Sequence, residues 1–186
     1  MNKYPEFAKV DNKKYKINTD FRVALRCNEV AESDVSKEER ALAIIYLLFG
    51  DEGLSDSKNW NDLLEIALKY LKCGRELEEN DSKEEVDMDF KQDWNYIQTS
   101  FFTDYQIDLE NKKMHWWKFY NLLCGLTDKS ILNRVRFVRT FDISQIKDSQ
   151  EKEKWIKQKQ QVELKKEKTQ EEKRLDELFE KQLRGE

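Results

Sequence analysis

Only one proline, Pro5, occurs in this chain of 186 residues, so little in the sequence interrupts helix formation. Beyond residue 18, apolar side chains recur every three or four positions in one segment after another, which is the spacing of amphipathic helices. No second cluster of alternating strand-forming residues appears. The sequence therefore predicts an all-α fold, a mainly helical bundle, with β-structure confined to a small N-terminal hairpin.

The hairpin is expected within the first eighteen positions. "PEFAKV" and "YKI" flank "DNKK", in which Asp11 and Asn12 favour a tight turn. The next segment, "NTDFRVALRCNEV", predicts the first helix. Asn18 or Thr19 is its expected N-cap, and Asp20 lies at the positive end of the helix dipole.

Two further helices carry recognisable end signals. In "SKEERALAIIYLLFG", Ser36 and Glu39 have the spacing of a capping box, and we expect a largely buried helix that ends at Gly50. "WNDLLEIALKYLKCG" predicts a third helix, which ends at Gly74.

Three more helical segments lie in the second half of the chain. "FKQDWNYIQTSFFTDYQIDL" has a wide aromatic face, residues 114–126 are apolar around most of a helix, and "SILNRVRFVRTF" is capped by Ser130. The last of these has a predicted apolar stripe of Ile131, Val135 and Val138.

Two segments differ in composition from these helices. Residues 76–89 hold eight acidic residues and one lysine, which predicts a flexible acidic loop. A calcium-binding EF-hand loop is rejected, because the glycine that its turn requires is absent from this segment. Residues 144–186 contain no proline and predict a long charged C-terminal helix, although its apolar residues are too sparse for an independent coiled coil. We therefore expect a helical domain over 1–143 and a charged helical extension over 144–186, which either projects or lies on another surface.

Composition argues against several classes of protein. Charged residues make up 39% of the chain, against about 25% in typical proteins, and the formal net charge is −4, so nucleic-acid binding is not favoured. No segment resembles a signal peptide or approaches the roughly 20 apolar residues that span a bilayer, so we expect no membrane association.

The cysteines and the single histidine do not predict a metal or cofactor site. Cys27, Cys73 and Cys124 form no CxxC motif, and their odd number excludes a closed set of disulfides, so we expect buried thiols. His115 is the only histidine, and no local spacing would complete a zinc site around it. We expect no metal, no cofactor and no enzymatic activity.

The segment "MHWWKFYNLLCGL", Met114 to Leu126, concentrates aromatic side chains beside His115. Packing in the core is the favoured interpretation, a docking surface for a partner is the second, and a ligand-stacking pocket is the third. His115 has the chemistry of a general base, but no nucleophile or orienting carboxylate can be assigned to it, so a helix-capping or surface role is preferred.

Arginines and phenylalanines alternate in "RVRFVRTF". Arg134, Arg136 and Arg139 beside Phe137 and Phe141 imitate a nucleic-acid site, but arginines in an acidic chain more often pair with its own carboxylates. Pairing with acidic groups of a protein partner is the intermediate hypothesis.

In order, the segments "YKINTDFR", "FFTDYQIDL", "MHWWKFYNLLCGL", "RVRFVRT", "DISQI" and a lysine-rich tail resemble a family of tail-region proteins from siphophages of Gram-positive hosts. The resemblance runs from about Tyr15 to Lys166, and the block around the paired tryptophans is its most specific part. The charged extension beyond Lys166 is longer than the family pattern.

The resemblance implies a non-enzymatic, mainly helical tail assembly chaperone that acts in the host cytoplasm and binds the tape measure protein, encoded next to it. A structural tail component retained in the virion is the alternative, and self-association into a homo-oligomer would suit the charged extension. Residues with the chemistry to contact a partner are Trp116, Phe119, Tyr120, Arg134, Arg136, Arg139 and Trp155.

Overall fold

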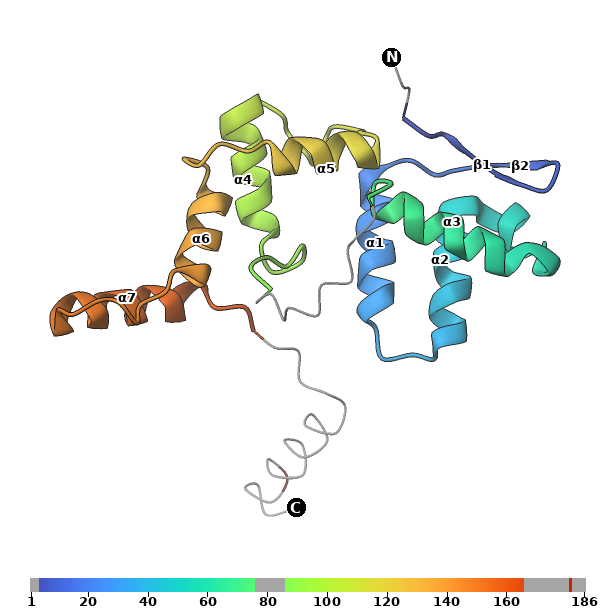
Figure 1. Cartoon of the computed structure of the whole chain (residues 1–186). Helices are drawn as coiled ribbons and strands as arrows, with labels where there is room; N and C mark the ends of the chain where they lie inside the picture. The colour runs from blue at the N-terminus through green and yellow to red at the C-terminus, as the bar shows by residue number, and fades with distance from the viewer. Residues whose placement is uncertain (1–3, 76–85, 166–180, 182–186) are drawn as a thin grey trace. The chain divides into compact units, whose positions relative to one another are not determined.

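The computed structural model describes residues 4–75, 86–165 and 181 of the protein. The chain forms two compact units, Met1–Phe141 and Asp142–Glu186, whereas the sequence placed the boundary after residue 143. The described residues contain one β-hairpin and seven α-helices, in the order drawn in Figure 1. The predicted mainly helical fold with an N-terminal hairpin is confirmed.

The hairpin pairs β1 (Phe7–Val10) with β2 (Lys13–Lys16) in antiparallel register, with Val10 opposite Lys13. Asp11 begins the connecting turn in the left-handed region, at φ 51°. The turn therefore lies at the two positions that the sequence indicated. Ala8, Val10 and Tyr15 are buried, so one face of the hairpin is part of the core.

Asp56 fixes the hairpin to the segment between residues 54 and 60. Its carboxylate accepts hydrogen bonds from the Tyr15 hydroxyl at 2.5 Å, from the Asn59 amide at 3.2 Å and from the Lys13 ammonium group at 3.3 Å. The hydrogen bond from Tyr15, followed by those from Asn59 and Lys13, lowers the pKa of Asp56 because each favours the ionised carboxylate.

The first helix, α1 (Phe21–Glu32), is capped by Asp20 rather than by Asn18 or Thr19. The Asp20 carboxylate accepts the backbone N–H of Arg22 at 3.0 Å. The two preceding residues are not helical, and their backbones bond to distant segments: Asn18 donates to Leu48, and Thr19 accepts from Trp116. These long-range bonds hold residues 18 and 19 outside the helix. Local sequence signals do not reveal such bonds, so the predicted N-cap was one or two positions too early.

The second helix, α2 (Lys37–Leu54), begins with the predicted capping box: Glu39 N–H donates to the Ser36 hydroxyl, and Ser36 N–H to the Glu39 carboxylate. The predicted end at Gly50 is wrong. Gly50 instead breaks the helix internally at φ 65° and ψ −159°, a conformation that glycine adopts without a Cβ clash, and helical structure resumes up to Leu54.

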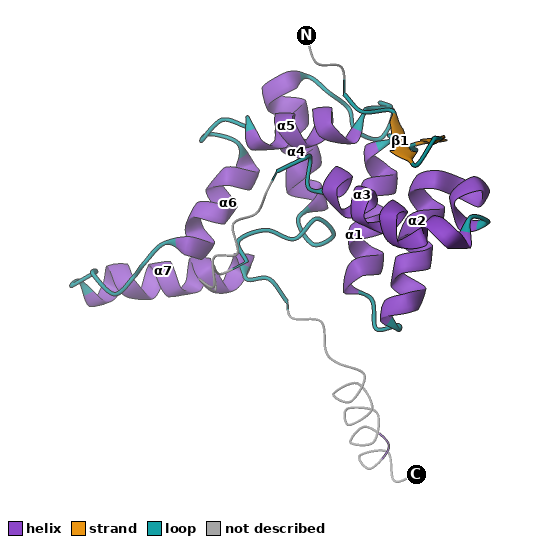
Figure 2. Ribbon diagram, turned by 45° about the vertical axis from the view of Figure 1, so that its right-hand side comes forward, coloured by secondary structure: helices purple, strands orange, loops and turns teal. Residues whose placement is uncertain are grey.

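A short 3-10 turn, η1 (Ser57–Asn59), leads into α3 (Trp60–Leu71). The end of α3 is a Schellman motif, in which Gly74 N–H donates to Lys69 and Cys73 N–H to Tyr70. Cys73 is itself left-handed at φ 56°, a position more often taken by glycine. In Figures 1 and 2, α1 and α2 lie side by side as an antiparallel pair, and α3 packs against α2.

The remaining helices of unit 1 are α4 (Trp94–Tyr105), α5 (Trp116–Cys124) and α6 (Ile131–Thr140). The antiparallel packing of α4 on α6 is fixed by Ser100, whose buried hydroxyl accepts the N–H of Leu132 at 3.1 Å. Ser130 caps α6 as predicted. The buried stripe of α6, however, is Leu132 and Val135, because this register places the residue after Ile131 against α4.

Stacked aromatic rings form the centre of unit 1. Phe119 lies 4.7 Å from Phe21 of α1, 5.0 Å from Phe101 of α4 and 5.7 Å from Trp116, measured between ring centroids. All four side chains are buried. Burial of each contributes on the order of 2 kcal/mol or more, so this stack accounts for much of the stability of unit 1.

The three cysteines are free thiols in different environments. Cys27 is buried, as predicted, but Cys73 is half-buried and Cys124 is exposed at the end of α5. The expectation of three buried thiols is therefore wrong, because Cys124 lies on the side of α5 that faces away from the aromatic stack. Burial raises the pKa of Cys27 to about 12 and that of Cys73 to about 11.

The described helix of the second unit is α7 (Ser149–Val162), capped by Asp148. Helical structure ends at Val162 and residues 163–165 are not helical, so the single helix predicted over 144–186 is interrupted there. Residues 166–180 and 182–186 lie outside the described residues. No residue of α7 is buried. A helix with so little apolar burial depends mainly on intrinsic propensity, which stabilises an isolated helix of this length only marginally.

Candidate interaction surface

The paired tryptophans at the start of α5 complete the end of α3. Trp116 donates its indole N–H to the carbonyl of Leu71, and Trp117 donates its indole N–H to the carbonyl of Tyr70, both at 2.9 Å. Tyr70 and Leu71 are the last two residues of α3, and their carbonyls have no N–H donor four residues further along the helix. The Tyr70 carbonyl accepts the N–H of Cys73 in addition to the indole N–H. The tryptophan pair therefore has a specific structural role in addition to its apolar bulk.

The first N–H groups of α1 and α5 find acceptors in a similar way, because each donates to a carbonyl that lies just before the other helix. Phe21 N–H donates to the Met114 carbonyl at 3.0 Å, and Trp116 N–H donates to the Thr19 carbonyl at 2.8 Å. Each donor is the first N–H of its helix, which has no intrahelical acceptor. Arg22 adds a further link, because its guanidinium donates to the carbonyls of Leu109 and Glu110 in the preceding loop.

His115 is a helix cap with both ring nitrogens engaged. Its Nδ1 accepts the N–H of Trp117 at 3.1 Å, so Nε2 carries the proton and donates to the Pro5 carbonyl at 3.0 Å. The Tyr4 ring stacks on the imidazole at a centroid distance of 5.0 Å. The capping interpretation is confirmed, and this bonding leaves neither nitrogen open to act as a general base.

Two of the residues predicted to contact a partner lie inside the core. Trp116 is 1% exposed and Phe119 is 0% exposed, so a partner cannot reach either side chain in this fold. Tyr120 is half-buried beneath the guanidinium of Arg75, whose carbon lies 4.8 Å from the ring centroid. The core interpretation of residues 114–126 thus describes most of these aromatic side chains.

Two of the three arginines of α6 bind carboxylates of the segment that precedes α4. Arg139 pairs with the buried Asp93 through two bonds, of 2.6 and 2.7 Å, and also donates to the Asp87 carbonyl. Arg136 donates from Nε and Nη2 to the Asp87 carboxylate at 2.9 and 2.7 Å. The C-terminal part of the predicted acidic loop, which includes Asp87, is therefore bound to α6; residues 76–85 lie outside the described residues.

The third arginine, Arg134, lies on the opposite side of α6. Its side chain is exposed, and no carboxylate of the described residues pairs with it. Phe137 is next to it at helical spacing and is 57% exposed, with its ring 5.4 Å from that of Phe141. We call these three residues, Arg134, Phe137 and Phe141, the α6 outer face. Phe137 was not among the predicted contact residues, although its spacing from the buried Leu132 and Val135 indicates an outward position.

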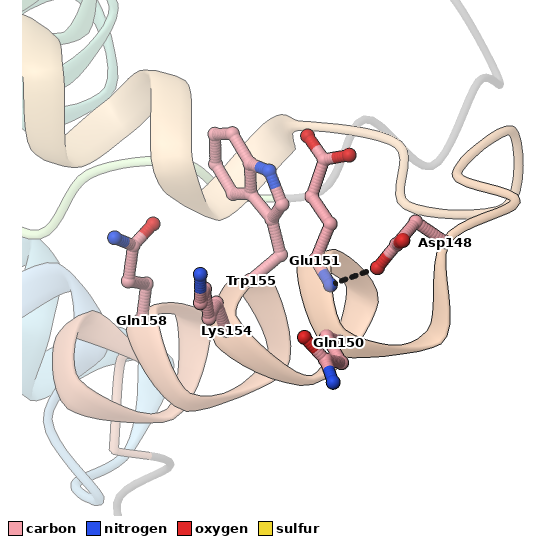
Figure 3. Close-up of a pocket in the computed structure, with 6 residues that line it drawn as sticks. All are labelled: Asp148, Gln150, Glu151, Lys154, Trp155 and Gln158. Carbon is pink, nitrogen blue, oxygen red and sulfur yellow. Dashed lines mark hydrogen bonds between the residues drawn. The ribbon is translucent and has the colours of Figure 1, made fainter.

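The seventh predicted contact residue, Trp155, lies on α7. Figure 3 shows it above the helix at the edge of a shallow, open pocket of about 570 Å³, lined by Asp148, Gln150, Glu151, Lys154, Trp155 and Gln158. Trp155 is half-exposed, and Ile156 beside it is 38% exposed. The pocket is polar, so its geometry suits contact with a partner surface better than enclosure of a small molecule.

Chemistry-bearing clusters are scarce in the structure. The described residues contain no group of three or more histidine, cysteine or acidic side chains placed to hold a metal ion. None of the described helices has the length and apolar character needed to cross a membrane. Among the predicted contact residues, Arg134 on the α6 outer face and Trp155 on α7 lie beside exposed apolar side chains, Phe137 and Ile156.

Comparison with known proteins assigns the chain to a family. The family model described as "Bacteriophage Gp15 protein" matches residues 2–164. The chain belongs to this family. No curated protein and no solved structure matches the chain. The region matched in this bacteriophage Gp15 family member spans unit 1 and continues through α7, so α7 is included in what the family model describes.

Proposed function

We propose that the protein is a non-enzymatic bacteriophage tail assembly protein, a chaperone that binds the tape measure protein during tail morphogenesis in the host cytoplasm. Membership of the bacteriophage Gp15 family supports a phage role, and the ordered resemblance to siphophage tail proteins supports the assembly step. The observation that carries the proposal is α7. This helix lies within the region matched by the family model, yet contributes no buried residue.

The chemistry of α7 suits a transient partner contact. Trp155 and Ile156 offer apolar surface, while four lysines and two glutamates keep the helix solvated. A tape measure protein is a long helical chain with apolar faces, which invite aggregation until tail subunits cover them. A partly apolar, charged helix can cover such faces with modest affinity, so that the assembling subunits can displace it.

The role of His115 supports a function without catalysis. Its two ring nitrogens cap α5 and bind the N-terminal segment, and the arginines at positions 136 and 139 bind carboxylates of the chain itself. These groups are thus used in holding the fold together.

Co-expression tests the proposal. The tape measure protein of the same phage is produced alone, with the wild-type protein, and with a Trp155→Ala/Ile156→Ser variant. We expect wild type to raise the soluble fraction of the tape measure protein and to co-purify with it, and the variant to do so less. Equal solubility with and without wild type, together with no co-purification, would contradict the proposal.

Mass spectrometry of purified phage particles separates the chaperone from a structural tail component. A chaperone leaves the assembled tail, so few or no peptides of the protein are expected. Peptides at the level of known tail subunits would instead identify a component that remains in the virion.

A further inference from the structure

The α6 outer face has a charge that differs from that of the whole chain. Helix α6 contains three arginines and no acidic residue, whereas the protein has a net charge of −4. Two of these arginines, Arg136 and Arg139, are committed to Asp87 and Asp93. Arg134 remains exposed on the outer face, so one guanidinium is available for an external anionic group.

The neighbouring aromatic side chain identifies what else the surface can bind. Phe137 keeps 57% of its area exposed, in contact with the ring of Phe141. Covering an exposed aromatic ring with an apolar side chain is favourable, and an arginine beside such a ring is a common centre of binding energy. The spacing of Arg134 and Phe137, three residues apart, places a charge and an apolar surface next to each other along the helix.

We infer that the α6 outer face is a docking site for an acidic amphipathic helix of the client protein, with a carboxylate on Arg134 and an apolar side chain on Phe137. This inference rests on the proposed function, because the client is the tape measure protein. Charge complementarity selects this occupant, and the chain already shows the pairing: the arginines on the other side of α6 bind carboxylates at 2.6 to 2.9 Å.

Two other occupants are outcomes of the test below. In a two-fold dimer, Arg134 contacts whichever residue of the other copy lies opposite it, so docking of a second copy would appear as self-association that depends on Arg134. Nucleic acid would meet a single available arginine on a protein of net negative charge, whereas phosphate binding draws on many basic groups. A carboxylate-bearing helix requires only one such contact beside an apolar one.

Binding titrations with two probes test the inference. The first probe is the purified tape measure protein of the same phage. The second is a labelled synthetic helix with leucines on one face and glutamates on the other, which reports on the surface without the client. We expect Arg134→Glu and Phe137→Ser each to weaken binding of both probes about tenfold, equivalent to about 1.4 kcal/mol. Added salt should weaken wild-type binding and have less effect on Arg134→Glu.

A matched control lies on α3. Leu68→Ser and Lys69→Glu remove an exposed apolar side chain and reverse an exposed charge in the same way, and both are expected to bind like wild type. Arg134→Gln serves as a milder variant, and an unchanged thermal transition in each variant shows that the fold is intact.

The outcomes separate the two proposals. If wild type binds the tape measure protein and both outer-face variants bind it equally well, the docking site is wrong and the proposed function stands. If only the synthetic helix binds, and binds through Arg134, the surface is supported and the proposed client is wrong. Failure of both probes to bind overturns both proposals. Both are also overturned if an Arg134-dependent dimer forms, or if a DNA duplex is retained, in place of probe binding.

Discussion

Helix α5 carries two tryptophans at its start and helix α7 carries one near its middle, yet the two helices differ in almost every other respect. Helix α5, Trp116–Cys124, is short and poor in strong helix formers, but it buries Trp116, Phe119 and Leu123. Helix α7 is longer and rich in lysine, glutamine and glutamate, and it buries nothing. Packing against α1, α3 and α4 sustains the first helix, whereas intrinsic propensity sustains the second.

This difference indicates that the aromatic and apolar residues of unit 1 and those of α7 have different roles. Aromatic residues within unit 1 fix helix ends and stack on one another, so changing them is expected to cost stability. Apolar residues of α7 lie at a half-exposed surface, so changing them is expected to cost binding. The first two predictions below therefore compare a site in unit 1 with one in the second unit, and the last two concern unit 1 by itself.

The largest effect is expected from the two tryptophans. Trp116→Ala removes a fully buried ring together with the indole donor to Leu71, and should lower the free energy of unfolding by about 3–5 kcal/mol. Trp155→Ala should change it by less than about 0.5 kcal/mol, as at other surface positions. Urea denaturation measures both. Similar losses for the two variants would show that the units share one core.

The next effect is expected at the buried ion pair. Asp93→Ala leaves Arg139 without its carboxylate in a buried position, and should cost about 3 kcal/mol. Asp148→Ala removes the N-cap of α7, with a local cost of about 1 kcal/mol and no shift in the main unfolding transition. Calorimetry of both variants is the measurement, and a lower melting temperature for Asp148→Ala would contradict the comparison.

A smaller, pH-dependent effect is expected at the hairpin. The pKa of Asp56 is lowered below its ordinary value of 3.8, chiefly by the Tyr15 hydroxyl, so its contribution to stability is present above that value and is lost as the pH falls through the folded pKa. Tyr15→Phe should raise the pKa of Asp56 and reduce the acid sensitivity of folding. NMR titration of the Asp56 carboxyl carbon tests this; an unchanged midpoint would assign the shift to Asn59 and Lys13.

The smallest effect is expected from removing the second unit. Deletion of residues 142–186 should leave the cooperative thermal transition of unit 1 in place, with a change below about 1 kcal/mol, because unit 1 has its own core. Loss of that transition would mean that the second unit completes the core.

Sequence periodicity predicted the helices and the hairpin because these depend on local spacing and turn residues. It misplaced the cap of α1, since the backbones of Asn18 and Thr19 bond to Leu48 and Trp116, far away in the sequence. It also treated Gly50 as an end, because a glycine that terminates a helix and one that kinks it have the same local signal.

The candidate surface was less predictable than the fold. The sequence indicated that α6 arginines pair with carboxylates, but not that Arg136 and Arg139 are paired while Arg134 is exposed. That distinction depends on the packing of α4 against α6, which brings Asp93 within 2.6 Å of a residue 46 positions away. Trp116 and Phe119 were assigned both to the core and to a partner surface, and only burial resolves that choice.

The indole bonds from α5 to the end of α3 have a consequence for the order in which the nascent chain acquires structure. When residues 60–75 leave the ribosome, the carbonyls of Tyr70 and Leu71 still lack the donors that Trp116 and Trp117 supply. The final turn of α3 should therefore fray, and its backbone N–H groups should exchange with solvent deuterium, until α5 has been synthesised and docked. Protection of both segments should then appear together in a pulse-labelling experiment.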